Sequence, residues 1–183
     1  MKVIQKIPII TLIKLCSIAI LIAVQVVLAR FLVIPIGDMM RFSTSFIPVV
    51  IAARKYGIGA GTAVYGLGDF IGAIVFPTGG AFFPGYTLTA VVVGLIFDLY
   101  LRPVKKQEST AAIKIKFFLS VLTTQFIGSF LMNSFWRSFQ TGVPYEAVLI
   151  TRLPQCLIST VIQTVFMVLF LEKICKAIKT PNV

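Results

Sequence analysis

The fold class is decided by the stretch Val161–Leu171, VIQTVFMVLFL. Its apolar side chains follow one another without the alternation of apolar and polar residues that a strand of a transmembrane barrel shows. In hydrocarbon every backbone amide must be hydrogen-bonded within the protein, which leaves helices and closed barrels as spanning structures. The stretch therefore predicts a helix that lies in a membrane.

The whole chain shares this apolar character. Of its 183 residues, 58% are hydrophobic and only 13% are charged, and the mean hydropathy is +0.99. A soluble fold of this size could not bury so much apolar side chain, because its surface is too large for its volume. Since one spanning helix takes about 20 residues, we expect residues 1–183 to form a single transmembrane domain. This domain is predicted to be all-α, a compact bundle of six transmembrane helices.

Turn-forming and charged residues divide the chain into six predicted spans. Their approximate ranges are 11–35, 42–53, 57–75, 86–101, 113–135 and 145–174. The second is short for a crossing helix, since a helix rises about 1.5 Å per residue. The segment Arg102–Thr110 is the only clearly polar linker, and it predicts an exposed joint between two groups of helices.

The lysines and arginines indicate how such a bundle is oriented. If six spans alternate, thirteen fall on one face: Lys2, Lys6, Lys14, Arg54, Lys55, Arg102, Lys105, Lys106, Lys114, Lys116, Lys173, Lys176 and Lys179. Only four fall on the other: Arg30, Arg41, Arg137 and Arg152. Cytoplasmic connections carry the excess of positive residues, so we expect both termini in the cytoplasm. The net charge of +11 then reflects topology, and no nucleic-acid partner is expected.

Residue types that catalysis and metal binding most often use are scarce. The chain has no histidine, the commonest general base and metal ligand. Cys16, Cys156 and Cys175 are scattered in apolar stretches, without the spacing of a metal or disulfide site. We therefore expect no catalytic residues, no metal and no cofactor, and a protein that is not an enzyme. A small membrane enzyme or scaffold acting on lipids is the alternative from another class.

Within the predicted third span, the stretch Gly57–Gly72 combines glycines with one carboxylate. Small residues four apart, such as Gly68 and Gly72, let helix backbones approach closely, and helix packing is the simpler interpretation. The glycines match neither a phosphate loop nor a dinucleotide fingerprint. Asp69 costs about 2.5 to 3.5 kcal/mol in hydrocarbon unless it faces the bundle interior or water. It is therefore either a structural partner of an arginine or helix end, or a ligand contact.

The connection Phe76–Gly85, FPTGGAFFPG, cannot continue a helix and carries no charge. Irregular apolar backbone at a membrane surface is tolerated where it folds over protein or lines a cavity. The connection therefore predicts a lid above a pocket, with an ordinary turn as the alternative.

Arginines on the predicted outer face and amides in the last two spans are candidate ligand contacts. Guanidinium groups make forked bonds to carboxylates, although each arginine could instead extend to lipid headgroups. Asn133, Trp136, Gln155 and Gln163 would suit a heteroaromatic ring with several donors and acceptors. Hydrogen bonding between helices is the alternative, and it is equally good for Gln163.

These features resemble the S components, the substrate-capture subunits of energy-coupling-factor (ECF) vitamin transporters. The resemblance covers nearly the whole chain and rests on six spans in under 200 residues, on Ala19 and Ala23 four apart, on Asp69 in its glycine-rich helix, and on residues 76–88, FPTGGAFFPGYTL. The last segment looks like the version found in folate-specific members. The resemblance implies a bundle that binds folate near the outer face of the bacterial plasma membrane. It also implies a membrane coupling subunit and two cytoplasmic ATPase subunits as partners, with Ala19 and Ala23 in contact with the coupling subunit.

Resemblance and physical argument together give a predicted substrate site. Its residues are Arg41, Asp69, Phe83, Pro84, Gly85, Asn133, Trp136, Arg137, Arg152 and Gln155. A pterin-like ring is expected among the aromatic and amide residues, with arginines meeting the glutamate carboxylates and Asp69 meeting a ring amino group. An S component for another vitamin, such as pantothenate, biotin or thiamine, is the nearest alternative.

Overall fold

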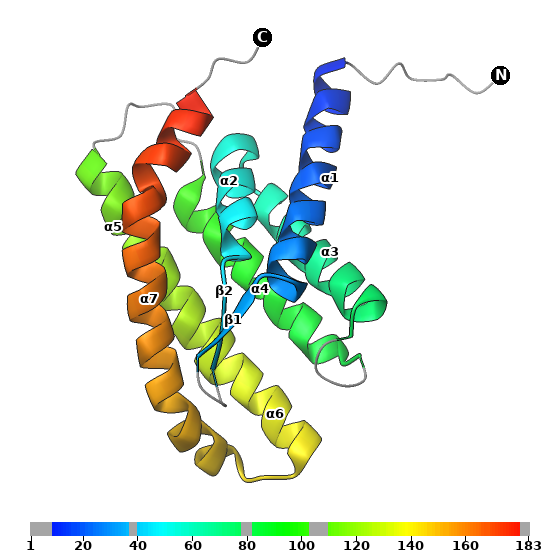
Figure 1. Cartoon of the computed structure of the whole chain (residues 1–183), viewed down its shortest axis with the longest axis vertical. Coiled ribbons are helices and arrows are strands. Elements are labelled where there is room, and N and C mark those ends of the chain that lie inside the picture. Colours follow the sequence, from blue (N-terminus) through cyan, green and yellow to red (C-terminus); the bar gives the residue numbers. More distant parts are fainter. Residues whose placement is uncertain (1–8, 37–39, 78–81, 103–109, 180–183) are drawn as a thin grey trace, which may run out of the picture.

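The computed structural model describes residues 9–36, 40–77, 82–102 and 110–179 and contains a bundle of helices with one short hairpin (Figure 1). The elements are α1 (Ile9–Arg30), β1 (Val33–Ile36), β2 (Met40–Ser43), α2 (Phe46–Tyr56), α3 (Ala60–Val75), α4 (Pro84–Leu101), α5 (Thr110–Thr124), the π-helix η1 (Gln125–Met132), α6 (Asn133–Thr141) and α7 (Tyr145–Lys179). Because α5, η1 and α6 follow one another without a break, the described ranges form six helical rods. The predicted helical bundle is confirmed.

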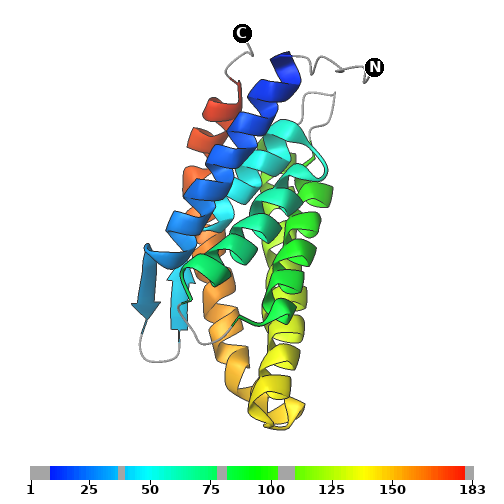
Figure 2. The ribbon, with the colours of Figure 1, turned by 90° about the vertical axis from the view of Figure 1, so that its right-hand side faces the viewer.

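The bundle has two distinct ends (Figures 1 and 2). At one, which we call the terminal end, α1 begins and α7 finishes. Toward the other, which we call the hairpin end, lie β1, β2 and the turn between α6 and α7. The cytoplasmic position of the terminal end stays a prediction from the distribution of lysine and arginine.

Several helices suit a membrane. Four helical stretches in the described ranges are long and apolar enough to cross one: Thr11–Arg30, Pro84–Leu101, Ala111–Thr141 and Tyr145–Phe166. Helix α3 is a shorter apolar helix. Large apolar side chains such as Ile20, Leu99 and Ile150 are exposed on the outside of the bundle. An exposed apolar surface of this kind is stable where lipid covers it.

The hairpin replaces the predicted end of the first span. We expected that span to reach Pro35, but α1 ends at Arg30 and the chain continues as β1, in which Ile34 pairs with Phe42 of β2. Proline cannot continue a helix, and the β-branched residues around it favour a strand. The second helix therefore begins at Phe46 and not at the predicted Phe42.

Several later boundaries also differ from the predicted spans. Helix α4 begins at Pro84, because proline fits the first position of a helix. The fifth rod runs to Thr141, six residues beyond the predicted end, and closes on Gly142 with a left-handed φ of 70°. Helix α7 continues to Lys179 and contains Pro154 in its interior.

Glycines bring α3 close to its two neighbours, as the packing interpretation predicted. A side chain at Gly68 would overlap Gln25 of α1. On the other flank, a methyl group at Gly94 of α4 would lie 2.7 Å from the Cα of Thr62. Gly57 is not part of the helix, since it lies in the preceding turn with φ 82°. Helix α3 therefore packs between α1 and α4 so closely that no side chain fits at these two glycines.

A buried carboxylate caps the start of α3. Asp98 of α4 is fully buried. Its two oxygens accept hydrogen bonds from the backbone N–H groups of Gly59, Gly61 and Thr62 at 2.8 to 2.9 Å, and from the Thr62 hydroxyl at 2.6 Å. The first amides of a helix lack partners within the helix, so Asp98 satisfies them and fixes α3 to α4.

Candidate functional site

A cavity of about 620 Å³ lies inside the bundle. Its walls come from the end of α1, β2, the start of α2, α3, α4, η1, α6 and α7. The lining residues are Arg30, Ser43, Ser45, Phe46, Tyr65, Asp69, Ala73, Pro77, Phe82, Phe83, Tyr86, Thr89, Ala90, Val93, Phe97, Thr124, Gln125, Gly128, Ser129, Asn133, Arg137, Gln140, Arg152, Gln155, Ser159 and Gln163. The volume is in the range of sites that enclose a small organic molecule.

One ion pair stands in the cavity wall. Arg30 Nη2 lies 3.6 Å from Asp69 Oδ1, and the Thr87 hydroxyl donates a hydrogen bond to Asp69 Oδ2 at 3.0 Å. These contacts join α1, α3 and α4. Of the two interpretations of Asp69 that the sequence allowed, the structure shows the first, a structural pair with an arginine. Asp69 also lines the cavity, so a ligand contact stays possible in geometry.

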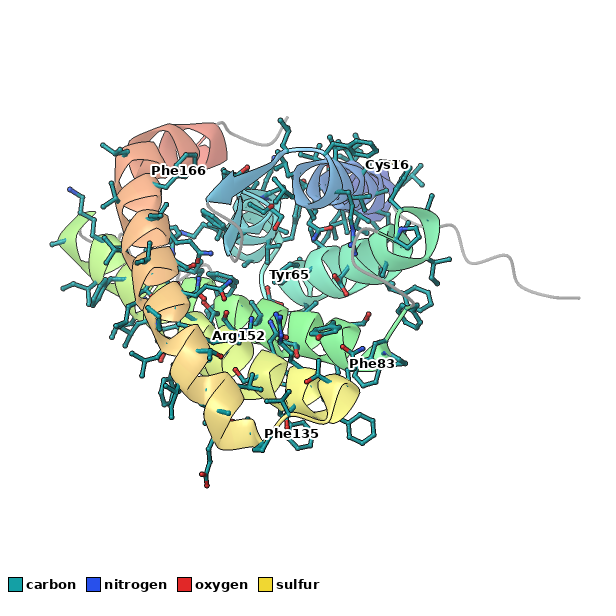
Figure 3. The ribbon with its side chains drawn as sticks, turned by 60° about the horizontal axis from the view of Figure 1, so that its bottom comes forward. Cys16, Tyr65, Phe83, Phe135, Arg152 and Phe166 are labelled. Atoms are coloured by element: carbon teal, nitrogen blue, oxygen red, sulfur yellow. The ribbon has the colours of Figure 1, made fainter. Side chains whose placement is uncertain are left out.

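Two further arginines line the cavity without a carboxylate partner among the described residues. They are Arg137 of α6 and Arg152 of α7. The Nε of Arg152 and the Oδ1 of Asn133 are buried and have no hydrogen-bond partner in the described part of the chain. Figure 3 shows Arg152 pointing from α7 into the interior of the bundle. Buried polar groups are almost always hydrogen-bonded, so these atoms indicate a place for a polar ligand.

Two rows of polar side chains face the cavity from neighbouring rods. On α7 the row is Arg152, Gln155, Ser159 and Gln163. On the rod formed by η1 and α6 it is Gln125, Ser129, Asn133 and Arg137. Residues three or four apart lie on one face of a helix, and the two rods run in opposite directions through the turn at Gly142. In each row the arginine lies nearest the hairpin end.

Aromatic side chains border the cavity toward the hairpin end. Phe83 lines it and packs edge-on against Trp136, with ring centroids 5.7 Å apart. Trp136 in turn donates its indole N–H to the Thr89 hydroxyl at 3.1 Å, and Thr89 lines the cavity. Gly85 leaves room for this pair, since a side chain there would overlap both Phe83 and Trp136. Trp136 thus lies one layer behind the cavity wall.

The structure brings six of the predicted substrate residues to the cavity: Asp69, Phe83, Asn133, Arg137, Arg152 and Gln155. Pro84, Gly85 and Trp136 do not line it; Trp136 packs behind Phe83, and Gly85 leaves room for that contact. For Arg41 only the backbone is described, in β2 opposite Pro35. Within the predicted lid, residues 78–81 lie outside the described residues.

Sequence reasoning missed several cavity residues. Gln163 was considered and left out of the site. Tyr65, Thr89 and Gln125 were not considered, and Arg30 was noted only as one of the outer arginines. The helical spacing of Gln155, Ser159 and Gln163 was the available signal. Tyr65 and Thr89 gave no such signal, because a single polar residue in an apolar helix is equally consistent with packing.

The predicted partner stripe lies on the surface. Ala19 and Ala23 are both exposed on α1. Within the described residues the stripe is therefore not an internal packing face of this chain.

Fold and cavity together define a class: a helical membrane protein with a polar site for a small molecule between its helices. Residues 14–171 match the ECF transporter, substrate-specific component family. The chain belongs to this family, whose members are substrate-binding components of transporters, and the predicted resemblance is confirmed.

The chain is also similar to individual members of this family. The chain is 31% identical to the "Folate transporter FolT" of Clostridium novyi (strain NT) over 137 residues, which are 74% of each chain. A solved structure described as "FolT bound with folic acid" matches with a TM-score of 0.69 and 25% identity, over 84% of this chain and 88% of that one. A structure of the S-component for biotin from an ECF-type ABC transporter matches with a TM-score of 0.58 and 19% identity, over 88% of this chain and 92% of that chain. The last match shows the fold alone.

Proposed function

We propose that this protein binds folate in the central cavity and delivers it across the plasma membrane as the S component of an ECF transporter. The observation that carries the proposal is the charge of the cavity. Three arginines and one carboxylate line it, a net charge of +2. The similarity to the FolT sequence and to the folic acid complex supports the same ligand.

This charge favours a dicarboxylate over the other vitamins considered. Folate carries two carboxylates on its glutamate, so it would neutralise the excess. Biotin and pantothenate each carry one carboxylate, and thiamine is a cation that the cavity would repel. A charge buried without a partner costs several kcal/mol, so the match in charge number contributes to specificity.

The lining residues suggest a role for each part of the ligand. Arg137 and Arg152 have free donors for carboxylates. Asn133 and Gln155 offer amide groups to a heteroaromatic ring, and Asp69, although paired with Arg30, keeps a face toward the cavity for an amino group. Phe83 would cover the ligand, and Trp136 would report binding through its contact with Phe83.

Transport requires partners that supply energy. We propose a membrane coupling subunit and two cytoplasmic ATPase subunits, as in the family to which this chain belongs, with the terminal end of the bundle in the cytoplasm. The coupling subunit would pack on α1, where Ala19 and Ala23 are exposed and let another helix approach closely.

Ligand titration tests the proposal. The protein is purified in detergent and inspected for a co-purifying ultraviolet absorber, and its Trp136 fluorescence is then followed during separate additions of folic acid, biotin, pantothenate and thiamine. We expect a saturable change with folic acid at far lower concentration than with the others. A response to biotin or thiamine alone would overturn folate as the ligand and leave the transporter family unchanged.

A further inference from the structure

Two lysines and a tyrosine meet at the terminal end of the bundle, where α1 and α2 pack together. The Lys14 ammonium lies 5.9 Å from the centroid of the Tyr56 ring, and the Lys55 ammonium lies 5.6 Å from the same centroid. Lys14 also donates a hydrogen bond to the backbone carbonyl of Tyr56 at 3.4 Å. We call these three residues the basic cluster. None of them lines the central cavity, so the cluster is a separate feature of the fold.

Packing of α1 on α2 brings the cluster together. On α1, Lys14 lies four and seven residues before Ile18 and Leu21, which pack against the core, and residues at this spacing share one face of a helix. Lys14 therefore reaches the C-terminus of α2, where Tyr56 is the last residue. Helix C-termini and the faces of aromatic rings both attract cations, which explains why two ammonium groups gather here.

The basic cluster carries more positive charge than the described residues around it neutralise. No ion pair joins Lys14 or Lys55 to any residue in the described ranges, and the C-terminus of α2 offsets only about half a charge. Asp98 binds the turn that follows α2, but it is fully buried and its oxygens already accept hydrogen bonds at the start of α3. An anion from outside the chain would therefore be stabilised at the cluster.

The basic cluster lies where lipid headgroups are expected. Lys14 is exposed and is the fourth residue of the candidate membrane span Thr11–Arg30. A lysine near the end of a span extends its ammonium to the headgroup region, and tyrosine is enriched at the same interface. Two residues after Tyr56, the exposed side chain of Ile58 offers apolar surface to an acyl chain. Charge and depth together fit an anionic lipid.

We propose that Lys14, Lys55 and Tyr56 bind the phosphate of an anionic lipid headgroup. Basic pockets between transmembrane helices are a known form of such sites. The two ammonium groups bind the phosphate oxygens, and the Tyr56 ring keeps both of them in position. With the terminal end in the cytoplasm, as proposed above, the lipid belongs to the inner leaflet and fixes the ends of α1 and α2 at its surface.

A partner subunit is the alternative occupant, and the geometry of α1 argues against it. At about 100° per residue, Lys14 is turned roughly 140° and 180° around the helix from Ala19 and Ala23. A subunit that packs on the exposed alanines therefore approaches the other side of α1. The basic cluster remains accessible to lipid beside it.

Lipid titration tests the proposal. The protein is purified in detergent and stripped of bound lipid. Its thermal unfolding is then followed during additions of dioleoyl phosphatidylglycerol, which is anionic, or of dioleoyl phosphatidylcholine, whose headgroup has no net charge. We expect a saturable rise in melting temperature with phosphatidylglycerol only. Inorganic phosphate at the same concentrations should have no effect, because it lacks the acyl chains, and an equal rise with it would replace the lipid by the free ion.

Single substitutions test the location. We expect Lys14→Gln and Lys55→Gln each to weaken phosphatidylglycerol binding on the order of fivefold, the contribution of one cation near an anionic lipid surface. Tyr56→Leu should weaken it as well, whereas Tyr56→Phe keeps the ring and should bind like the wild type. Lys114→Gln is the matched control, because Lys114 is exposed near the start of α5 as Lys14 is near the start of α1. The control should bind like the wild type.

Three results would overturn the proposal. Equal effects of the two lipids on the wild type would show that the headgroup charge is not recognised. Equal weakening by Lys114→Gln would assign the effect to the net charge of the terminal end. Unchanged lipid binding in Lys14→Gln and Lys55→Gln, with loss of uptake in cells that supply the partner subunits, would assign the basic cluster to a partner protein. The test needs no folic acid, so its outcome is independent of the proposed function.

Discussion

Arg30 of α1 and Asp69 of α3 form an ion pair at 3.6 Å in the wall of the cavity, with both side chains largely buried. Removing one partner leaves the other charge without compensation, whereas removing both does not. We expect Asp69→Leu to lower the free energy of unfolding by about 2 kcal/mol and the double variant Arg30→Met with Asp69→Leu to lower it by less. Thermal unfolding of ligand-free protein in detergent measures both. Additive effects of the two single changes would show that the pair is not coupled.

The Asp98 cap should be a large determinant of stability. Asp98→Ala leaves three backbone N–H groups, that of Gly61 fully buried, without their acceptor, so we expect a loss of about 3 to 5 kcal/mol or failure to fold. Thr62→Val removes only the hydroxyl contact to the same carboxylate and should cost about 1 kcal/mol. Unfolding in denaturant compares the two. Equal losses would contradict a capping role that rests on the backbone amides.

Close packing of α3 on α4 predicts a strong effect of one methyl group. Gly94→Ala would place its methyl 2.7 Å from the Cα of Thr62, and backbone cannot move away as a side-chain end can. We expect a loss of about 2 kcal/mol. Leu95→Ala is the control on the next residue, because Leu95 is exposed. A melting temperature lowered more by the control than by Gly94→Ala would refute the close contact.

Arg137 and Arg152, which have no carboxylate partner among the described residues, should govern binding of an anionic ligand. We expect Arg137→Gln and Arg152→Gln each to weaken folic acid binding roughly 10- to 100-fold, since a hydrogen bond to a charged group is worth about 1.5 to 3 kcal/mol. Arg152→Lys keeps the charge and loses the forked geometry, so it should recover part of the affinity. Fluorescence titration gives the three constants. Unchanged affinity in both glutamine variants would place the carboxylates elsewhere.

The exposed alanines on α1 should matter for transport and not for binding. We expect Ala19→Trp and Ala23→Trp to abolish uptake in cells that supply the partner subunits, with folic acid affinity retained, because a large side chain keeps a second helix from approaching. Ile115→Trp places the same side chain at an exposed position on α5 and should leave uptake intact. Loss of binding in the alanine variants would make α1 part of the site.

Much of the architecture could be predicted from residue patterns. Apolar composition and the length of the runs predicted a helical bundle, and the spacing of the glycines in α3 predicted close packing. Local propensity also limited the prediction. The end of α1 was placed at Pro35, although the residues before and after that proline favour a strand, as the hairpin shows.

The lining of the cavity depended on tertiary structure more than the helices did. Hydropathy is a sum over neighbours in sequence, so it determined that this chain lies in lipid as a set of helices and that a charged residue such as Asp69 must face the interior. Which polar residues share one cavity depends on helix rotation and depth, which arise only when the rods pack. Gln125 and Gln163 lie 38 positions apart in sequence, and only the antiparallel packing of two rods brings them to the same cavity. The sequence by itself determined that lipid surrounds the protein and that its secondary structure is mostly helical. The packing of the helices decided which polar residues form the cavity.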